Sequence, residues 1–331
     1  MSHRTFLTAS NLAGVVAAAF GPGHVLTDVI RLQGGSKKGV YRLTFSDASS
    51  AILYVWDPVE NYWPMPPATT VSEPVDPFAD ASGADLFEAS YAELAALGVR
   101  TPRLHLLDGS KTVLAADFAI VEDVRGPSLE RMLATDPRAA RPVLAELAAA
   151  LQVMHAHRSP SIGKVATIEA GHATSDQRCE QIVLHRALAQ LSEAADQVDK
   201  LALAHAALAD LLERWTAEVV PRSDHGLIHG ELGPDHVLID DSGHPAIIDI
   251  EGLMFFDVEW EHAFLELRFH DDYRQLRADD LDEQRMRLYR LALHISLVAG
   301  PLRLLDGDFP DAPLMRSIVE WNLEKTLSFV E

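Results

Sequence analysis

The first part of the chain has the hydrophobic pattern of strands. Short runs of apolar and polar residues at 25–31, 40–45 and 51–56 are separated by turn sequences, and the polar turn SDASS joins the last two. Such runs between turn signals are typical of paired strands, so we expect an antiparallel meander. Two further strands are predicted over RLHLLDG (103–109) and FAIVEDV (118–124).

Helical patterns flank these strands. Segment 6–20 resembles a signal peptide, but three polar residues interrupt its apolar run, and a capped surface helix is the better interpretation. Segment 85–97 has apolar residues at helical spacing and is followed by a glycine. Between the strands and this helix, residues 57–83 are rich in Pro, Asp and Ser, which predicts a long loop.

The remainder of the chain is dominated by Ala- and Leu-rich helical patterns. We predict helices over 128–134, 138–156, 176–195, 197–218, 258–270, 280–305 and 311–330, interrupted by strands at 236–240 and 246–250. The sequence thus predicts an α+β, two-lobed protein. A small antiparallel β-rich N-terminal lobe would occupy 1–124, and a larger, mainly α C-terminal lobe would occupy 125–331. We expect no membrane span, because no run of 18 apolar residues is present.

Composition narrows the classes of partner. The 331 residues carry a formal net charge of −21, which disfavours nucleic acid and anionic membranes as partners because both are polyanions. A cationic small molecule remains compatible with this charge. Cys179 is the only cysteine, so no intrachain disulfide can form, and we expect a reducing cytoplasm.

A glycine-rich turn lies between the first two predicted strands. It reads Gly34-Gly35-Ser36 and is followed by Lys37 and Lys38. Glycines let backbone N–H groups approach phosphate oxygens closely, and the lysines add positive charge. Taken alone, the same residues also fit an ordinary hairpin turn with a solvated basic tip.

The stretch LIHGELGPDHVLIDDSGHPAIIDIEG, residues 227–252, is more specific. Glu231 follows one extended run and Asp249 follows the next, 249 − 231 = 18 residues later. Asp249 comes directly after apolar residues, and a carboxylate at the edge of a core normally has a metal, a donor or a cation as its partner. Two carboxylates placed in this way can serve one pocket, one as base and one as metal ligand.

The order of these motifs resembles the aminoglycoside phosphotransferase family, small-molecule kinases with a protein-kinase-like fold. The family reads H-G-D-x-x-x-x-N, then I-D-W/F, then G-D-P-x-x-D-L-A. Here the corresponding segments are HGELGPDH, AIIDIEG and FFDVEWEHA, and the preceding GGS turn, LFEA, GVRTPRL and IVEDVRGPSL follow in matching order. The resemblance covers most of the chain and is most specific over 225–260.

The resemblance implies roles for individual residues. Glu231 occupies the position of the catalytic base, and His229 is grouped with it as a catalytic candidate. His236 stands at the metal-binding asparagine position, and Asp249 matches the aspartate that chelates magnesium. Asp257 matches a later aspartate that braces the catalytic loop.

The resemblance also implies a nucleotide site. Glu88 matches a helix glutamate that pairs with a strand lysine, and the backbone of Glu122 to Val124 matches the hinge that holds the adenine. The implied activity is transfer of the γ-phosphate of ATP or GTP, with Mg²⁺ or Mn²⁺, to a hydroxyl of an antibiotic-like or metabolite substrate.

Three departures from the pattern matter. Glu231 replaces an aspartate. His236 replaces an asparagine, and an imidazole is a poorer ligand for magnesium than for manganese or zinc. Glu251 or Asp235 could supply the missing oxygen.

The third departure concerns a lysine. The strand AILYVW has none at the expected place, where Tyr54 or Trp56 stands instead. Lys37, Lys38 and Arg42 are the candidate substitutes.

Two other functions are alternatives to the kinase. The departures favour a pseudokinase that binds a nucleotide or small ligand without turnover. A metal-dependent hydrolase using His229, Glu231, His236 and Asp249 is a weaker alternative, because no HExxH spacing is present. The acidic stretch FFDVEWEHAFLELRF, residues 255–269, predicts either the lining of an acidic cleft or a helix with a solvated face. The sequence specifies neither the acceptor nor the oligomeric state.

Overall fold

A computed structural model describes residues 4–64, 76–79, 82–171 and 178–330. Parts of the predicted loop 57–83 and the first two residues of the helix predicted over 176–195 lie outside the described residues. The chain forms two compact units. Unit 1 comprises residues 1–63, 80–146 and 235–252, and unit 2 comprises 64–79, 147–234 and 253–331. Unit 1 thus includes two segments beyond the predicted 1–124 lobe.

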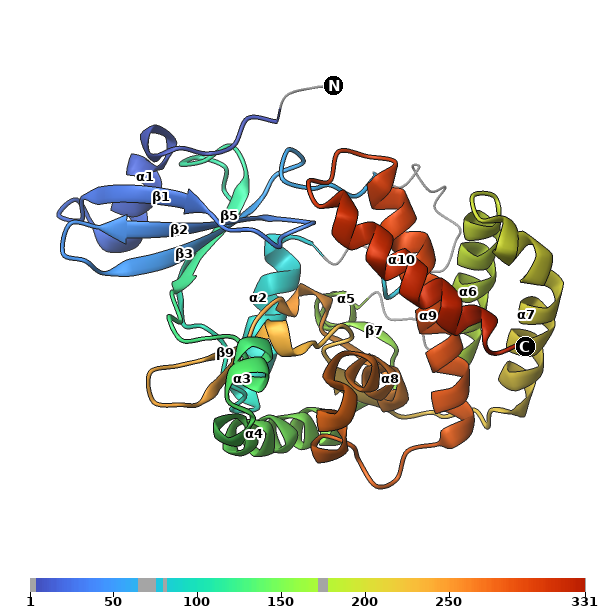
Figure 1. Ribbon diagram of the computed structural model, residues 1–331. Coiled ribbons are helices and arrows are strands. Elements are labelled where there is room, and N and C mark those ends of the chain that lie inside the picture. The colour runs from blue at the N-terminus through green and yellow to red at the C-terminus, as the bar shows by residue number, and fades with distance from the viewer. Residues whose placement is uncertain (1–3, 65–75, 80–81, 172–177, 331) are drawn as a thin grey trace. The chain divides into compact units, whose positions relative to one another are not determined.

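Unit 1 is built on a five-stranded sheet. Its strands are β1 (Leu26–Arg31), β2 (Gly39–Phe45), β3 (Ser50–Trp56), β4 (Leu104–Asp108) and β5 (Asp117–Glu122), in the order β1-β2-β3-β5-β4 with every neighbouring pair antiparallel. The predicted meander of the first three strands is confirmed. Helix α1 (Ala9–Phe20) lies along one face of this sheet (Figure 1).

The register of β2 and β3 decides which side chains share a face. Val40 lies opposite Tyr54, and Gly39 lies opposite Val55. Tyr41 belongs to the hydrophobic core beneath α1. Because successive side chains of a strand point to opposite faces, Val40 and Tyr54 face away from α1. Helix α2 (Ala84–Ala96) contributes Phe87 to this second face, with its ring centroid 5.9 Å from that of Tyr54.

A hairpin late in the sequence belongs to unit 1. Strands β9 (Val237–Ile239) and β10 (Pro245–Ile247) pair antiparallel. The Ile239 N–H donates to the Pro127 carbonyl, just before helix α3 (Leu129–Thr135), and the Ile247 N–H donates to the Arg100 carbonyl. A Cβ on Gly126 would lie 1.9 Å from the Ile239 carbonyl oxygen, so only glycine permits this approach. These bonds explain why residues 125–146 group with the sheet.

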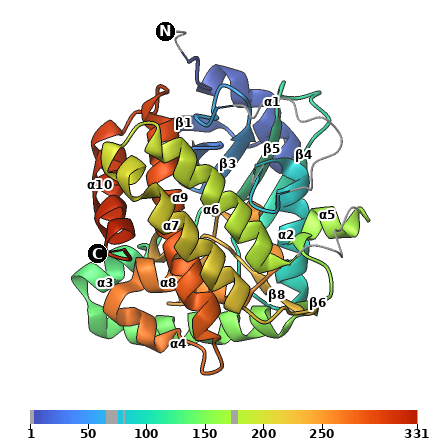
Figure 2. The ribbon, with the colours of Figure 1, turned by 90° about the vertical axis from the view of Figure 1, so that its right-hand side faces the viewer.

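Unit 2 is a set of helices around α9. The helices of the C-terminal part are α4 (Pro137–Ala156), which begins in unit 1, α5 (Val165–Glu169), α6 (Cys179–Ala195), α7 (Asp199–Glu218), α8 (Val258–Phe269), α9 (Glu283–Leu305) and α10 (Ala312–Leu327). Helix α9 packs against α6, α7, α8 and α10 (Figure 2). It is long and apolar enough to cross a membrane, but 61% of its apolar window is buried in the protein, as in the core helix of a helical bundle.

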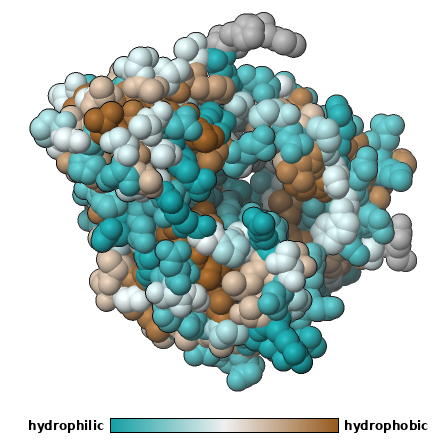
Figure 3. Space-filling model, turned by 60° about the vertical axis from the view of Figure 1, so that its left-hand side comes forward, coloured by the Kyte–Doolittle hydropathy of each residue, from teal (hydrophilic) through white to brown (hydrophobic). Residues whose placement is uncertain are grey.

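Unit 2 also contains a four-stranded sheet that the sequence did not predict. Its strands are β6 (Arg158–Ser159), β8 (His225–Ile228), β11 (Met254–Phe256) and β7 (Gly163–Lys164), in that spatial order. Within the described residues, three short 3₁₀ helices are also present: η1 (Pro234–His236), η2 (Ile250–Gly252) and η3 (His270–Gln275). On the face of the molecule shown in Figure 3, hydrophilic residues predominate, and hydrophobic residues form smaller patches between them.

Candidate active site

The glycine-rich turn of unit 1 is held in a specific conformation. Gly34 has a φ of +113°, in the region that favours glycine. A Cβ on Gly35 would lie 2.5 Å from the Lys38 carbonyl oxygen, so a larger residue there would displace the turn. The Trp63 indole N–H donates to the Ser36 hydroxyl at 2.9 Å. Trp63 therefore fixes the turn.

Lys38 is a buried cation of unit 1 that contacts two carboxylates. Its Nζ lies 2.8 Å from Asp249 Oδ1 and also donates to Glu251 Oε1. The Tyr54 ring lies beneath the ammonium, 4.8 Å from Nζ to the ring centroid, and the Trp56 indole N–H donates to Glu251 Oε1 at 3.1 Å. Burial alone would lower the pKa of Lys38, but the two carboxylates hold that pKa above its ordinary value.

The other candidate cations have different partners. The Lys37 Nζ lies 5.6 Å from the centroid of the Trp63 ring. Arg42 forms a bidentate pair with Asp123 at 2.9 and 3.1 Å. Glu88 is exposed on α2. The lysine of this site pairs with Asp249 and Glu251 rather than with Glu88.

Oxygen ligands gather around Asp249. This residue adopts a φ of +63°, which is uncommon outside glycine and typical of functional turns. Its Oδ2 lies 3.8 Å from His236 Nε2, which lies 3.7 Å from Asp235 Oδ2. Glu251 is 3% exposed, and its Oε2 has no hydrogen-bond partner among the described residues. Carboxylate oxygens that include a buried one without a partner fit a divalent cation.

The hinge candidates lie at the end of β5. The Glu122 carboxylate accepts from Arg100 at 3.0 Å and from the Arg103 N–H at 3.0 Å. Burial would raise the pKa of Glu122, but these bonds hold that pKa below its ordinary value. The Glu122 N–H donates to the Arg103 carbonyl, and Val124 is buried. The Glu122 carboxylate and N–H are thus engaged in holding the end of the sheet.

In unit 2, the loop that carries Glu231 is fixed by helix α8. The loop follows β8 directly. The His229 and Gly230 N–H groups donate to Glu261 Oε2 at 2.5 and 3.3 Å. The Trp260 indole N–H donates to the Gly230 carbonyl at 3.2 Å. Backbone groups are therefore anchored on both sides of Gly230, while Glu231 itself is exposed.

Three acidic side chains at the start of α8 face the core. Glu261 is fully buried, and burial raises its pKa to about 7, although its backbone hydrogen bonds act in the opposite direction. Glu259 is also fully buried and forms a bidentate pair with Arg222 at 2.6 and 2.7 Å. Asp257 is 1% exposed. Both sequence interpretations of this stretch, an acidic cleft and a solvated face, are therefore wrong for these three residues, which support the structure from within.

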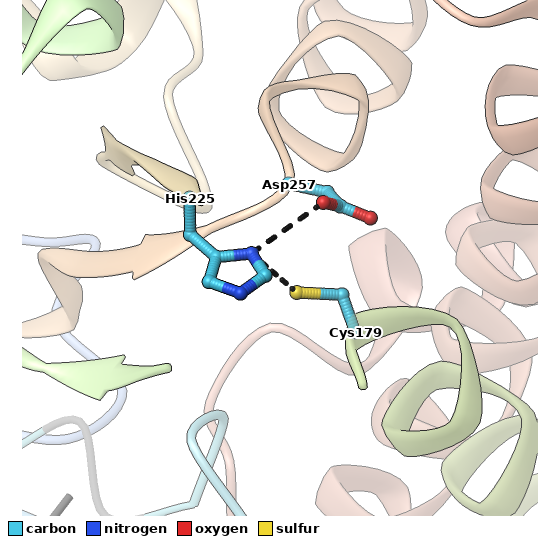
Figure 4. A group of neighbouring side chains, drawn as sticks. All are labelled: Cys179, His225 and Asp257. Atoms are coloured by element: carbon cyan, nitrogen blue, oxygen red, sulfur yellow. Dashed lines mark hydrogen bonds and ion pairs between the residues drawn. The ribbon is translucent and has the colours of Figure 1, made fainter. Parts of the chain in front are cut away.

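Asp257 lies at the centre of a buried polar cluster (Figure 4). Its Oδ1 lies 3.7 Å from His225 Nδ1, which lies 3.4 Å from the Cys179 Sγ. Its Oδ2 pairs with Arg285 and accepts from the Tyr289 hydroxyl at 2.5 Å. Burial would raise the pKa of Asp257, but His225 and Arg285 hold it below its ordinary value.

The cluster acts as a brace. The ligand atoms of Cys179, His225 and Asp257 lie within 4.8 Å of one another. The Asp257 carboxylate also pairs with the Arg285 guanidinium, and burial raises the pKa of the Cys179 thiol well above its usual range. Asp257 is the residue that precedes α8, so the cluster fixes the start of the helix that anchors the Glu231 loop.

The chain is similar to a known protein family. The sequence profile described as the phosphotransferase enzyme family matches residues 29–294. Among curated proteins, no sequence matches the chain.

Solved structures with the same fold include several phosphotransferases. The aminoglycoside phosphotransferase APH(4)-Ia is 18% identical, with a TM-score of 0.62 over 96% of this chain and 99% of that chain. The GDP and kanamycin complex of APH(2")-IIia is 20% identical, with a TM-score of 0.62 over 94% and 97%. Spectinomycin phosphotransferase APH(9)-Ia, in complex with ADP and spectinomycin, is 11% identical, with a TM-score of 0.65 over 96% and 94%. At these identities the likeness establishes the fold.

Proposed function

Because the chain belongs to the phosphotransferase enzyme family, we propose that it transfers the γ-phosphate of ATP or GTP to a hydroxyl of a small molecule. The observation that carries this proposal is the buried Lys38 ammonium, bonded to Asp249 and Glu251 and joined directly to the glycine-rich turn. A cation beside backbone N–H groups that glycines leave accessible suits the phosphates of a nucleotide. The compartment we propose is the cytoplasm.

The metal ligands would be Asp249 and Glu251, with His236 and Asp235 beside them. A bound divalent cation, Mg²⁺ or Mn²⁺, would neutralise charge on the β- and γ-phosphates. Lys38 would hold the Asp249 carboxylate in place, since one Asp249 oxygen already contacts its ammonium. The mixed oxygen and imidazole set favours Mn²⁺ more than an all-oxygen set would.

Glu231 would act on the acceptor. Its carboxylate would accept the proton of the attacking hydroxyl, whose oxygen forms a bond to the γ-phosphorus while the bond to the β–γ bridging oxygen breaks and the nucleoside diphosphate leaves. His229 and Gly230 would set the position of this base through their hydrogen bonds to Glu261. The exposure of Glu231 suits a residue that must meet a substrate.

The acceptor we propose is a cationic small molecule with a free hydroxyl, such as a polyamine-like or amino-sugar compound. The net charge of −21 would attract such a substrate. Structural neighbours in complex with kanamycin and with spectinomycin support a small-molecule acceptor of this size.

A two-step experiment tests the proposal. Thermal shift with ATP and GTP, each with Mg²⁺ or Mn²⁺, should show stabilisation that requires both nucleotide and metal, and Asp249→Asn should lose it. Radiolabelled γ-phosphate should then pass to at least one member of a panel of amino-sugar and polyamine alcohols. Nucleotide binding without transfer to any acceptor or to water would favour the pseudokinase. Stoichiometric zinc without nucleotide binding would favour the hydrolase.

A further inference from the structure

The cation of the candidate nucleotide site comes from a different strand than the family pattern implies. That pattern implies a lysine in β3, where this chain has Tyr54 and Trp56. In the structure the site is occupied by Lys38, the residue immediately before β2. Val40 pairs with Tyr54, so Lys38 lies two residues from Val40 on the same face of the sheet. The ammonium thus reaches the face on which a β3 lysine at position 54 would lie.

Two aromatic residues of β3 contact this lysine and its carboxylate partner. The Tyr54 ring lies against the Lys38 ammonium, 4.8 Å from centroid to Nζ, at a distance where a cation and an aromatic face attract. The Trp56 indole N–H and the Lys38 ammonium donate to the same oxygen of Glu251. Tyr54, Trp56 and Lys38 therefore form one arrangement, in which a buried lysine just before β2 lies where the family pattern implies a lysine of β3.

We propose that Lys38, and not a residue of β3, supplies the cation that binds the phosphates of the nucleotide and orients Asp249. This inference rests on the proposed phosphotransferase activity. It assigns the charge to the same segment as the glycine-rich turn, so the turn and the cation act as one phosphate-binding element. Lys38 is 7% exposed, as expected for a group that is held in place before the ligand arrives.

Transplantation of the lysine tests the assignment. The variants are Lys38→Met, the double variant Lys38→Met/Tyr54→Lys, and Lys111→Met as the matched control. Lys111 lies in unit 1 beyond β4 with its side chain 60% exposed. The readouts are nucleotide affinity and the release of inorganic phosphate from ATP or GTP with Mg²⁺ or Mn²⁺, without an acceptor.

We expect Lys38→Met to lower kcat/KM by about 10²–10³-fold, the usual cost of one preorganised charge contact. The double variant should recover at least about tenfold of that loss, because Tyr54 lies on the same face. The control should match the wild type. Full activity in Lys38→Met, or no recovery in a folded double variant, would overturn the assignment.

Loss of folding must be separated from loss of binding. Lys38→Met leaves Asp249 and Glu251 without their cation, which destabilises a buried site. Lys38→Arg keeps the charge, and we expect it to stay folded but to bind nucleotide more weakly than the wild type, since a guanidinium does not reproduce the point charge of an ammonium. Wild-type affinity and turnover in Lys38→Arg and Lys38→Met alike would refute the inference. If the wild-type protein neither binds nor hydrolyses any nucleotide, the proposed function itself fails.

Discussion

Replacing Glu261 with glutamine should change how the stability of the protein depends on pH. Glu261 is fully buried, and its Oε2 accepts the backbone N–H groups that hold the Glu231 loop. Burial raises the pKa of its carboxyl from 4.5 to about 7. Between these values the folded protein retains a proton that the unfolded chain has released, so stability falls as the pH rises across this window.

The magnitude follows from the width of that window. The interval from 4.5 to about 7 spans about 2.5 pH units, and at about 1.4 kcal/mol per unit the loss is about 3 kcal/mol between pH 4.5 and pH 8. A glutamine at 261 keeps the shape and the acceptor oxygen but cannot ionise. Its NH₂ would replace Oε1, which has no hydrogen-bond partner among the described residues. That costs about 1–3 kcal/mol at every pH and leaves the slope unaffected.

Two buried histidines also make the stability depend on pH. The difference between the stability–pH curves of the wild type and Glu261→Gln is therefore more informative than either curve alone. Burial lowers the pKa of His155 to about 3 and that of His262 to about 4. The folded protein keeps both rings neutral, so their contribution to stability is lost as the pH falls below 6.5. This slope opposes that of Glu261 in part of the same range, and subtraction of the two curves removes it.

The assay is denaturant unfolding of the wild type and Glu261→Gln at half-unit intervals from pH 4.5 to pH 8. Glu266→Gln is the control, because Glu266 lies on the same helix with its side chain 40% exposed. The wild-type curve should fall by about 3 kcal/mol relative to that of Glu261→Gln, while the control should run parallel to the wild type. Parallel curves for the wild type and Glu261→Gln would refute the reasoning.

Three further predictions concern the brace, the base and the metal. Arg285→Met should lower the free energy of unfolding by about 3–5 kcal/mol, because it removes the cation nearest to the buried Asp257 carboxylate and leaves only Arg222, at 3.8 Å; Arg287→Met, at a side chain 38% exposed, should cost under about 1 kcal/mol in the same denaturation assay. Glu231→Gln should reduce turnover by about 10²–10⁴-fold with nucleotide affinity nearly unchanged, and Glu231→Asp should also be impaired, since its reach is shorter by about 1.5 Å; a gain of phosphotransfer in the aspartate variant would indicate a pseudokinase. Mn²⁺ should support nucleotide binding at least as well as Mg²⁺, and His236→Asn should shift the preference toward Mg²⁺ in calorimetric titrations; an unchanged preference would remove His236 from the site.

Hydrophobic periodicity predicted most of the fold because the local pattern determines most of its elements. The predicted strand 51–56 is β3 (Ser50–Trp56), and the predicted helix 197–218 is α7 (Asp199–Glu218). The sheet of unit 2 was missed. Its strands are between two and four residues long, and such short runs carry no measurable alternation.

The site was predicted only as far as motifs define it. The segments around Glu231 and Asp249 could be located, because their spacing in the chain is informative by itself. The role of Glu261 could not, since a glutamate on an amphipathic helix is usually solvated and its burial depends on tertiary packing. The sequence also suggested three possible cations, and only the register of β2 against β3 separates them. A slip of one residue would turn Lys38 to the opposite face of the sheet.

The same dependence on register explains how a lysine outside β3 can supply the charge of this site. What phosphoryl transfer requires is a positive charge at one point beside Asp249, and any backbone position within reach of that point can supply it. Lys38 reaches it from the entrance of β2 because its ammonium is held by two carboxylates and an aromatic face, all from other segments of unit 1. A family motif defined only by strand and residue spacing would indicate that this chain lacks the cation. Only the three-dimensional position of Nζ shows that the cation is present.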